Sequence, residues 1–321
     1  MNLFFVIDEY TDIEPPAVVR ETVDVMIDVL ENPYKPRPEG ENIFGQIMKE
    51  FVLFFFRLST QSQESSRFWE LMLKTASPTS AKHFLETFPE YLESNVTQAR
   101  ARDDSLLTVD EYFLVRRKNI GVLPSFVPGE LHLELPDEAF YHPVITEMQQ
   151  CVADLVFIDN VSRPFNFFRK VAVKHFSLKD MTSYNKEQAA GDDRFNIVTI
   201  AMRQFNLDVA GAMQWACTYH HEIEAKFIRL VDSVPSFSPK VDKDLHQYVL
   251  HLANWPQGNY CWHFESERYF GKKGLDVKQS RQVVLLPKVR ANPGQRGLFY
   301  FCLSVYISIV NGLASVYVTL V

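Results

Sequence analysis

The pattern of apolar and polar positions along the chain is mostly that of amphipathic helices. Apolar residues recur at helical spacing from Val18 to Leu30, and comparable windows follow along most of the chain. These further windows cover residues 43–58, 68–73, 81–101, 108–117, 141–158, 183–190, 209–231 and 241–255. Strand-like alternation is scarce, and no glycine-rich phosphate loop is present. The pattern therefore predicts an all-α fold of about ten helices.

Local residue types also predict several helix ends. Pro15 and Pro16 precede the first long window, a position that suits the first turn of a helix. Thr108, followed three residues later by Glu111, has the spacing of a capping box. Gly121 then predicts the end of that helix.

Composition limits the classes of protein that fit this pattern. The 321 residues are 46% hydrophobic and 23% charged with only 12 glycines, which indicates a folded protein and excludes low-complexity classes. The four cysteines lie far apart without metal-ligand spacing, so we expect a reducing compartment and a cytoplasmic protein. A net charge of -7 argues against nucleic acid as a partner.

The charge is unevenly distributed along the chain. Residues 161–179 contain five Lys or Arg and no acid, and residues 289–321 contain two Arg and no acid. Without these segments 26 basic residues face 40 acidic ones, a net charge of -14. We therefore predict one domain over residues 1–288, interrupted at 161–179, and an atypical apolar tail over 289–321.

The tail permits two interpretations. Residues 297–321 form 25 positions without a charge, which is long enough to span a bilayer. Asn311 and Gly312 make it a poor span, and no basic cluster follows it. We interpret the tail as a gene-model artefact or a tail anchor, and expect no membrane association unless the tail is real.

The first candidate site follows the apolar N-terminal run, in the segment Asp8-Glu9-Tyr10-Thr11-Asp12. On a helix Asp8 and Asp12 share one face, whereas Glu9 points aside. Paired carboxylates are suitable ligands for Mg²⁺ ions that also bind phosphate oxygens. The alternative is a solvated acidic turn at a helix end.

The second candidate site is split by the basic segment. Ser183 and Glu187 are four residues apart. Lys179 lies four residues before Ser183, at the position where a third metal ligand would be needed. Excision of residues 161–179 would join Asn160 to Asp180. Asn160, Ser183 and Glu187 would then lie on one helical face, each offering an oxygen to a hard cation.

The boundaries of residues 161–179 are compatible with a translated intron. Valine codons begin with GT, a lysine codon can end in AG, and the segment would be 57 nucleotides long and in frame, since it encodes 19 residues. A genuine surface insertion with a basic face is the alternative. We favour the intron.

Five blocks in order make the chain resemble the fungal, basidiomycete-type class I terpene synthases of the sesquiterpene cyclase family. The similarity covers residues 1–288. The blocks are residues 2–12, 116–121, 160 with 180–193, 255–259 and 265–271. The resemblance implies an isoprenoid synthase helical bundle, of which this chain would be an N-terminally truncated form because it begins inside the helix bearing the first motif.

The resemblance also implies roles for individual residues. The expected metal ligands are Asp8, Asp12, Asn160, Ser183 and Glu187. The expected diphosphate-binding residues are Arg116, Arg117, Lys186, Arg268 and Tyr269, with Arg116, Arg268 and Tyr269 expected to be catalytic. Either Arg116 or Arg117 is similar to the family's diphosphate sensor, and we prefer Arg116.

The activity implied is cyclisation of farnesyl diphosphate to a sesquiterpene, with three Mg²⁺ ions and release of diphosphate, by a monomer or weak homodimer. Geranyl and geranylgeranyl diphosphate are open alternatives as substrates, and the product is not predicted. The alternative from another class is a catalytically inactive terpene-synthase-like protein, truncated and with a split metal motif, which its tail could tether to a membrane. An elongating prenyltransferase is disfavoured because those enzymes use two aspartate-rich motifs.

Aromatic and histidine residues supply further candidates. Aromatic faces can stabilise a carbocation, and the candidates for this role are Phe4, Phe5, Phe88, Trp262 and Phe264. For each of them core packing is the competing interpretation. His220-His221-Glu222 is not predicted to bind metal, because adjacent residues point to different faces of a helix.

Overall fold

The computed structural model describes residues 2–56, 77–104, 107–158, 180–191, 193–267, 269–280, 286–288, 305–308 and 315–318. These residues are helical apart from short connections and one pair of strands, which confirms the predicted all-α class. The first helices are α1 (Asn2–Thr11), α2 (Pro16–Glu31), α3 (Ile43–Phe56), α5 (Pro78–Asp104), α6 (Val109–Asn119), α7 (Val122–Phe126) and α8 (Asp137–Phe140). The later ones are α9 (Pro143–Ile158), α10 (Asp180–Ala190), α11 (Ile197–Phe205), α12 (Val209–Val231), α13 (Pro239–Glu265) and α14 (Gly274–Ser280).

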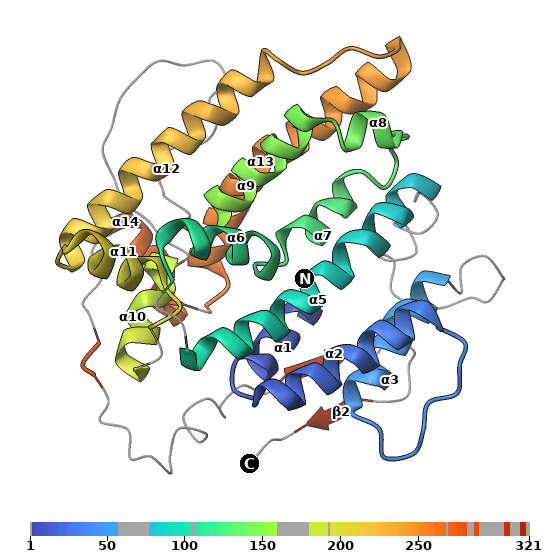
Figure 1. The fold of residues 1–321 in the computed structure, drawn as a ribbon, viewed down its shortest axis with the longest axis horizontal. Coiled ribbons are helices and arrows are strands. Elements are labelled where there is room, and N and C mark those ends of the chain that lie inside the picture. The colour runs from blue at the N-terminus through green and yellow to red at the C-terminus, as the bar shows by residue number, and fades with distance from the viewer. Residues whose placement is uncertain are drawn as a thin grey trace.

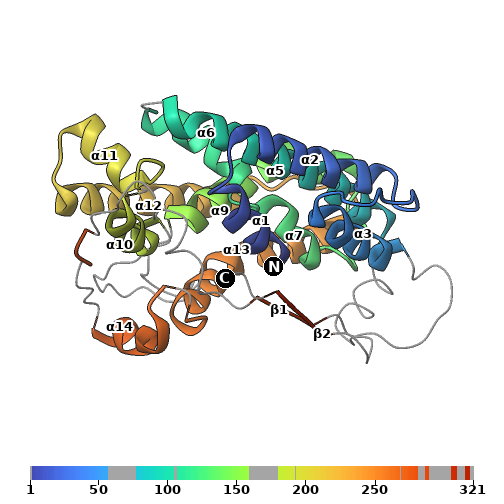
Figure 2. The same cartoon turned by 90° about the horizontal axis from the view of Figure 1, so that it is seen from below.

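The long helices form a bundle with a common direction. In Figure 1, α2, α5, α9, α12 and α13 run along the same diagonal, and in Figure 2 α2 and α5 lie on the opposite side of the bundle from α14. α2 packs against α3 and α5, while α9 packs against α12 and α13. α5 also contacts α1, α6 and α7, so this helix joins the two parts of the bundle.

Two hydrophobic clusters correspond to those two parts. One lies among α1, α2, α3 and α5 and includes the fully buried Ile7, Met26 and Phe88. The other lies among α6, α9, α11, α12 and α13 and includes the buried Phe157, Phe227 and Tyr248. Asp8 follows Ile7 directly on α1, so the first core cluster anchors the helix that carries the first acidic motif.

The helix termini show the capping chemistry that the sequence suggests. The Thr108 capping box is present, with the Thr108 side chain accepting from the Glu111 N–H and the Glu111 carboxylate accepting from the Thr108 N–H. Pro16 and Pro239 occupy first-turn positions of α2 and α13, where a missing N–H removes no helical hydrogen bond. Asp208 caps α12 by accepting from the N–H of Gly211.

Several helices differ from the sequence prediction, and the predicted window over 68–73 lies outside the described residues. The short helices α7, α8 and α14 lie outside the predicted windows. α11 also lies outside the predicted windows, although its apolar residues recur at helical spacing. α13 was predicted to end at Trp255 but continues to Glu265. Pro256 lies inside it and is buried, so packing holds the helix together although one backbone hydrogen bond is missing.

The apolar tail is described over two short segments. β1 (Val305–Ser308) pairs antiparallel with β2 (Ser315–Val318), and Val305 lies opposite Val318. Among the described residues no helix combines the length and apolar character needed to cross a membrane. Residues 161–179, and most of 289–321, lie outside the described residues, so the interpretation of both segments and of the domain boundary stays a prediction.

Candidate active site

The first acidic motif lies at the end of α1, against α5. The Asp12 N–H donates to the Asp8 carbonyl (2.8 Å), so the two carboxylates are one helical turn apart, as predicted. The hydroxyl of Tyr91 on α5 donates to Asp8 Oδ1 (2.7 Å), and Gln98 Nε2 donates to Asp12 Oδ1 (2.9 Å). Burial, together with the neighbouring Asp8 carboxylate, raises the pKa of Tyr91 well above its ordinary value, which keeps its hydroxyl protonated as a donor.

A buried polar chain leads from this motif to the arginine pair. Arg116 Nη1 donates to Asn119 Oδ1 (2.8 Å), and Asn119 Nδ2 donates to Asn95 Oδ1 (3.2 Å). Thr11 Oγ1, on α1, lies 3.4 Å from the same Asn95 oxygen. Thr11, Asn95 and Asn119 are all buried. Arg116 is thereby connected to the helix that carries Asp8.

The neighbouring arginine has a different partner. Arg117 donates from Nε to Asp154 Oδ1 and from Nη2 to Asp154 Oδ2, both at 2.7 Å. Burial raises the pKa of Asp154 and the Arg117 guanidinium opposes that rise, while the Asp154 hydrogen bond raises the pKa of Arg117. The structure thus separates the two candidates. Arg117 is held by Asp154 on α9, whereas Arg116 donates into the series of buried polar side chains that reaches α1.

Gly121 allows the backbone to turn between α6 and α7 beside this chain. Its φ of +66° lies in the left-handed region that favours glycine. A Cβ at this position would lie 2.9 Å from Cδ1 of Phe4 and 3.2 Å from Cε2 of Tyr91. Glycine is therefore needed both for the backbone angle and for the close approach of α1 and α5.

The second motif lies on α10, where Ser183 and Glu187 are both partly buried. Asn196, at the start of α11, donates from Nδ2 to Glu187 Oε2 (2.8 Å), and the same Nδ2 lies 3.5 Å from Ser183 Oγ. Asn160 and Arg268 lie outside the described residues, and the side chain of Lys186 is likewise not described. Their predicted roles therefore stay predictions.

The aromatic candidates divide into two groups. Phe5 on α1 and Trp262 on α13 are partly buried and stack face to face, with ring centroids 5.0 Å apart and an interplanar angle of 1°. Tyr269 meets the Trp262 ring edge-on at 6.0 Å. Phe88 and Phe264 are buried in the packed interior. Phe5 and Trp262, which are far apart in the sequence, therefore lie together and form one partly buried aromatic pair.

The histidine pair on α12 has the arrangement expected for adjacent helical residues. His220 is buried, and burial lowers its pKa to about 3, so the ring stays neutral. His221 is exposed, and its Nδ1 lies 2.6 Å from the Cys217 carbonyl. Over the described part of the chain no group of three or more His, Cys, Asp or Glu side chains could hold a metal ion.

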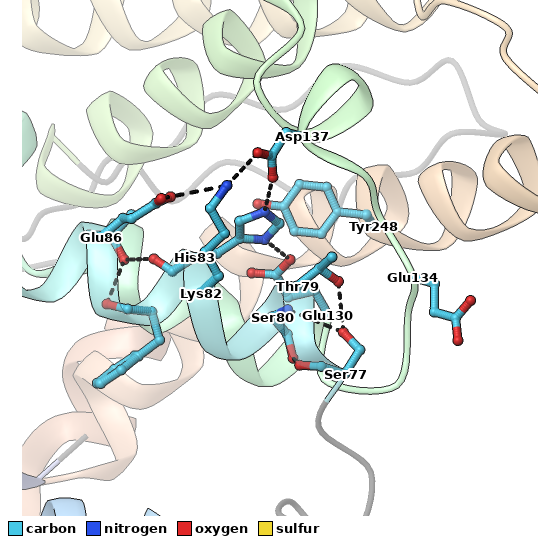
Figure 3. Close-up of polar contacts among 12 residues, drawn as sticks. Ser77, Thr79, Ser80, Lys82, His83, Glu86, Glu130, Glu134, Asp137 and Tyr248 are labelled. Carbon is cyan, nitrogen blue, oxygen red and sulfur yellow. Dashed lines mark hydrogen bonds and ion pairs between the residues drawn. The ribbon is translucent and has the colours of Figure 1, made fainter.

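A separate buried polar cluster lies at the start of α5. His83 Nδ1 lies 2.8 Å from Glu130 Oε2, and both side chains are almost fully buried. Figure 3 shows the His83 ring between Glu130 and Asp137, with Lys82 reaching the Asp137 carboxylate. The ring stacks on Phe140 at 3.6 Å. His83 lies two helical turns before Tyr91 on α5, so this cluster is distinct from the acidic motif.

Comparison with known proteins places these features in a family. The family model described as "Terpene synthase family 2, C-terminal metal binding" matches residues 1–226. Sesquiterpene synthase 14 of Postia placenta is 50% identical over 294 residues, which cover 91% of this chain and 74% of that relative. The chain belongs to the terpene synthase family. It is an enzyme of this type, and the match gives no support to a non-catalytic protein.

Other relatives and solved structures agree with this family. Delta(6)-protoilludene synthase 18 of Postia placenta is 44% identical over 289 residues, covering 90% of this chain and 72% of that relative. Among solved structures, germacradien-4-ol synthase from Streptomyces citricolor has a TM-score of 0.56 at 17% identity, over 80% of this chain and 73% of that one. Wild-type cucumene synthase has a TM-score of 0.53 at 14% identity, over 77% and 70%. These two structures support the class I terpene synthase fold.

Four residues that contact this site were not predicted from the sequence. They are Tyr91, Gln98, Asn196 and Asp154, and each contacts a predicted site residue although none belongs to a motif. Asn196 had a local signal, because an asparagine before an apolar run is a good N-cap. Tyr91 and Asp154 pair with residues far away in sequence, a relationship that local patterns do not contain.

Proposed function

We propose that this chain is a Mg²⁺-dependent cyclase that converts farnesyl diphosphate to a sesquiterpene. The observation that carries the proposal is the presence of two oxygen-donor motifs, Asp8 with Asp12 on α1 and Ser183 with Glu187 on α10, in a chain of a metal-binding synthase family. Carboxylate and hydroxyl oxygens fit Mg²⁺, which prefers hard ligands. Asn160 would complete the second motif.

The metal ions would neutralise charge on the diphosphate oxygens as the allylic C–O bond breaks. The leaving diphosphate takes the electron pair of that bond. A double bond elsewhere in the remaining carbocation then attacks the cationic carbon and closes a ring. Loss of a proton ends the sequence, so the products are one hydrocarbon and inorganic diphosphate. The chain's own part is to bind the diphosphate, shape the carbocation's path and exclude water.

Arginine and lysine side chains supply the donors to the diphosphate. Arg116 is the proposed sensor, because Arg117 is already held in a two-point pair with Asp154 whereas Arg116 is linked through Asn119 to α1. A guanidinium suits this role because its planar fork meets phosphate oxygens in pairs. Lys186, Arg268 and Tyr269 are proposed as further donors by resemblance to the family.

The stacked rings of Phe5 and Trp262 are the proposed aromatic surface for the carbocation. Both are partly buried, and Trp262 also contacts the proposed diphosphate-binding Tyr269. Cation–π attraction at such a ring is worth about 0.5–2 kcal/mol. We further propose that the protein acts in the cytoplasm, as a monomer or weak homodimer.

The test is product analysis with two forms of the chain, one as given and one that lacks residues 161–179 and is extended upstream. Each is incubated with farnesyl diphosphate and Mg²⁺, and volatiles are identified by gas chromatography with mass spectrometry. An authentic Δ6-protoilludene standard is included because several relatives are named for that product. We expect a sesquiterpene from the form without the segment, lost in Glu187→Gln and retained in Glu222→Gln, an exposed carboxylate on α12. Absence of hydrocarbon from both forms would overturn the proposal.

A further inference from the structure

Asn196 occupies the turn between α10 and α11, where one side chain serves two helices. It is fully buried. Its Oδ1 accepts from the Val198 N–H (2.9 Å) and so caps α11, while its Nδ2 donates to Glu187 Oε2 (2.8 Å). The same Nδ2 lies 3.5 Å from Ser183 Oγ. The oxygen of this amide therefore faces the N-terminus of α11, and its nitrogen faces the motif on α10.

The chemistry of the amide determines which way it points. Exchanging the amide oxygen and nitrogen would place Oδ1 against the Glu187 carboxylate and an N–H₂ group against the Val198 N–H. Both contacts would then be repulsive. Serine or aspartate would cap α11 as well as asparagine does, but neither supplies an acceptor for the cap together with an N–H₂ donor for Glu187. The contact with Glu187 is thus specific to asparagine.

The position of Asn196 is itself rigidly held. The first residues of α11, Ile197 and Val198, are fully buried against the larger core cluster. Thr199 Oγ1 donates to Asp193 Oδ2 (2.8 Å), which ties the preceding turn to the same helix. A side chain anchored in this way can restrict the rotamers of the residue to which it donates.

We propose that Asn196 is a positioning residue that orients Glu187, and with it Ser183, for binding of a divalent cation and diphosphate. The inference rests on the proposed function, in which these two residues are metal ligands. Hydrogen bonds that orient metal ligands typically change metal affinity by about 10–100-fold when removed. The same magnitude is expected here.

The test uses the full chain and measures Mg²⁺ binding by calorimetric titration in the presence of inorganic diphosphate. Asn196→Ser keeps an N-cap for α11 and removes the donor to Glu187. Its apparent Mg²⁺ dissociation constant is expected to rise by about 10–100-fold. Asp208→Asn is the matched control, because it changes the N-cap of α12, which accepts from the Gly211 N–H (2.7 Å) and belongs to neither motif. Its Mg²⁺ binding is expected to equal that of the unsubstituted chain.

Thermal unfolding without ligand shows whether each variant folds. If Asn196→Ser does not fold, Asn196→Thr, which also caps α11 and adds no charge beside Glu187, replaces it. Failure of both to fold assigns Asn196 to the fold alone and overturns the positioning role. Unchanged Mg²⁺ binding by a folded variant overturns it too and leaves the proposed function intact. Absence of saturable binding by the unsubstituted chain instead overturns the proposed metal site, and the inference with it.

Discussion

The guanidinium of Arg117 and the carboxylate of Asp154 form a two-point ion pair, with both N–O distances at 2.7 Å. The Asp154 side chain is 6% exposed, so its charge depends on this partner, while Arg117 is 28% exposed. The pair links α6 to α9 immediately beside the proposed sensor Arg116. Its first role is therefore structural.

Replacing Arg117 by methionine should destabilise the protein by about 3 kcal/mol, because it leaves a buried carboxylate without its counter-charge. Arg20→Met is the control. Arg20 also binds a carboxylate with two nitrogens, at 2.6 and 3.0 Å, but its partner Glu93 is exposed. Arg20→Met should therefore lower the free energy of unfolding by less than about 1 kcal/mol. Urea unfolding of both variants measures the difference, and equal losses would contradict the assignment.

The Arg117→Met deficit should also depend on pH. Burial raises the folded-state pKa of Asp154, and Arg117 opposes that rise. Without Arg117 the pKa rises further, so the folded state binds a proton more readily than the unfolded state as the pH falls. The deficit should shrink as the pH is lowered from neutral toward that raised pKa. A deficit that grows on acidification would contradict this prediction.

Glu130→Gln should remove part of the pH dependence of stability. Burial raises the pKa of Glu130, although His83 lowers it, so the folded state favours the protonated acid and the contribution of Glu130 to stability rises as the pH falls from neutral. Glutamine keeps an acceptor for His83 but does not titrate. The expected result is a variant at least as stable at neutral pH, without that gain. The measurement is the unfolding free energy between about pH 5 and pH 8.

Glu134→Gln is the matched control for this experiment. Glu134 is exposed, and its ion pair with Lys240 lowers its pKa, so its contribution is lost only at more acidic pH. The stability of Glu134→Gln should follow the wild-type dependence over the same pH range. A slope change equal to that of Glu130→Gln would show that burial is not its cause.

Gly121→Ala should destabilise the protein more than Gly40→Ala. Both glycines have positive φ, +66° and +80°, so alanine strains the backbone at each by about 1 kcal/mol or more. A Cβ at Gly40 meets nothing within 4 Å, whereas at Gly121 it lies 2.9 Å from the Phe4 ring. The additional loss of stability in Gly121→Ala, measured by thermal unfolding, reports how closely Phe4 of α1 approaches Gly121. Equal losses would show that Phe4 moves aside freely.

The sequence predicts those parts of this fold that have local causes. The capping box at Thr108, the helix over Val209–Val231 and the one-turn spacing of Asp8 and Asp12 follow from periodicity and side-chain chemistry, and all three are present. α11 has local signals of the same kind, since it has caps at both ends and apolar residues at helical spacing, yet the windows predicted above do not include it.

Contacts between distant residues have no such local signal. Arg116 and Arg117 are adjacent and chemically identical, so only the packing of α6 between α5 and α9 gives them different partners. Phe5 and Trp262 meet for the same reason, since α1 and α13 come from opposite ends of the chain. The sequence alone therefore offers a set of candidates, and tertiary packing separates them.

Tyr91→Phe should weaken the proposed metal site while leaving the fold intact. The change removes the hydroxyl that donates to Asp8 Oδ1 (2.7 Å), so the carboxylate loses the contact that orients it from α5. We expect the apparent Mg²⁺ dissociation constant, measured with inorganic diphosphate, to rise about tenfold. The loss in unfolding free energy should be about 1 kcal/mol.

Tyr248→Phe makes the same chemical change elsewhere and serves as the control. Tyr248 is also fully buried, and its hydroxyl accepts from Gln149 Nε2 (2.9 Å), far from α1 in the sequence and in the other core cluster. It should lose similar stability with unchanged Mg²⁺ binding. Because both variants remove one hydroxyl from a buried ring, a difference in metal affinity isolates the contact with Asp8. Equal Mg²⁺ affinities would show that Tyr91 supports only the packing of α1 on α5.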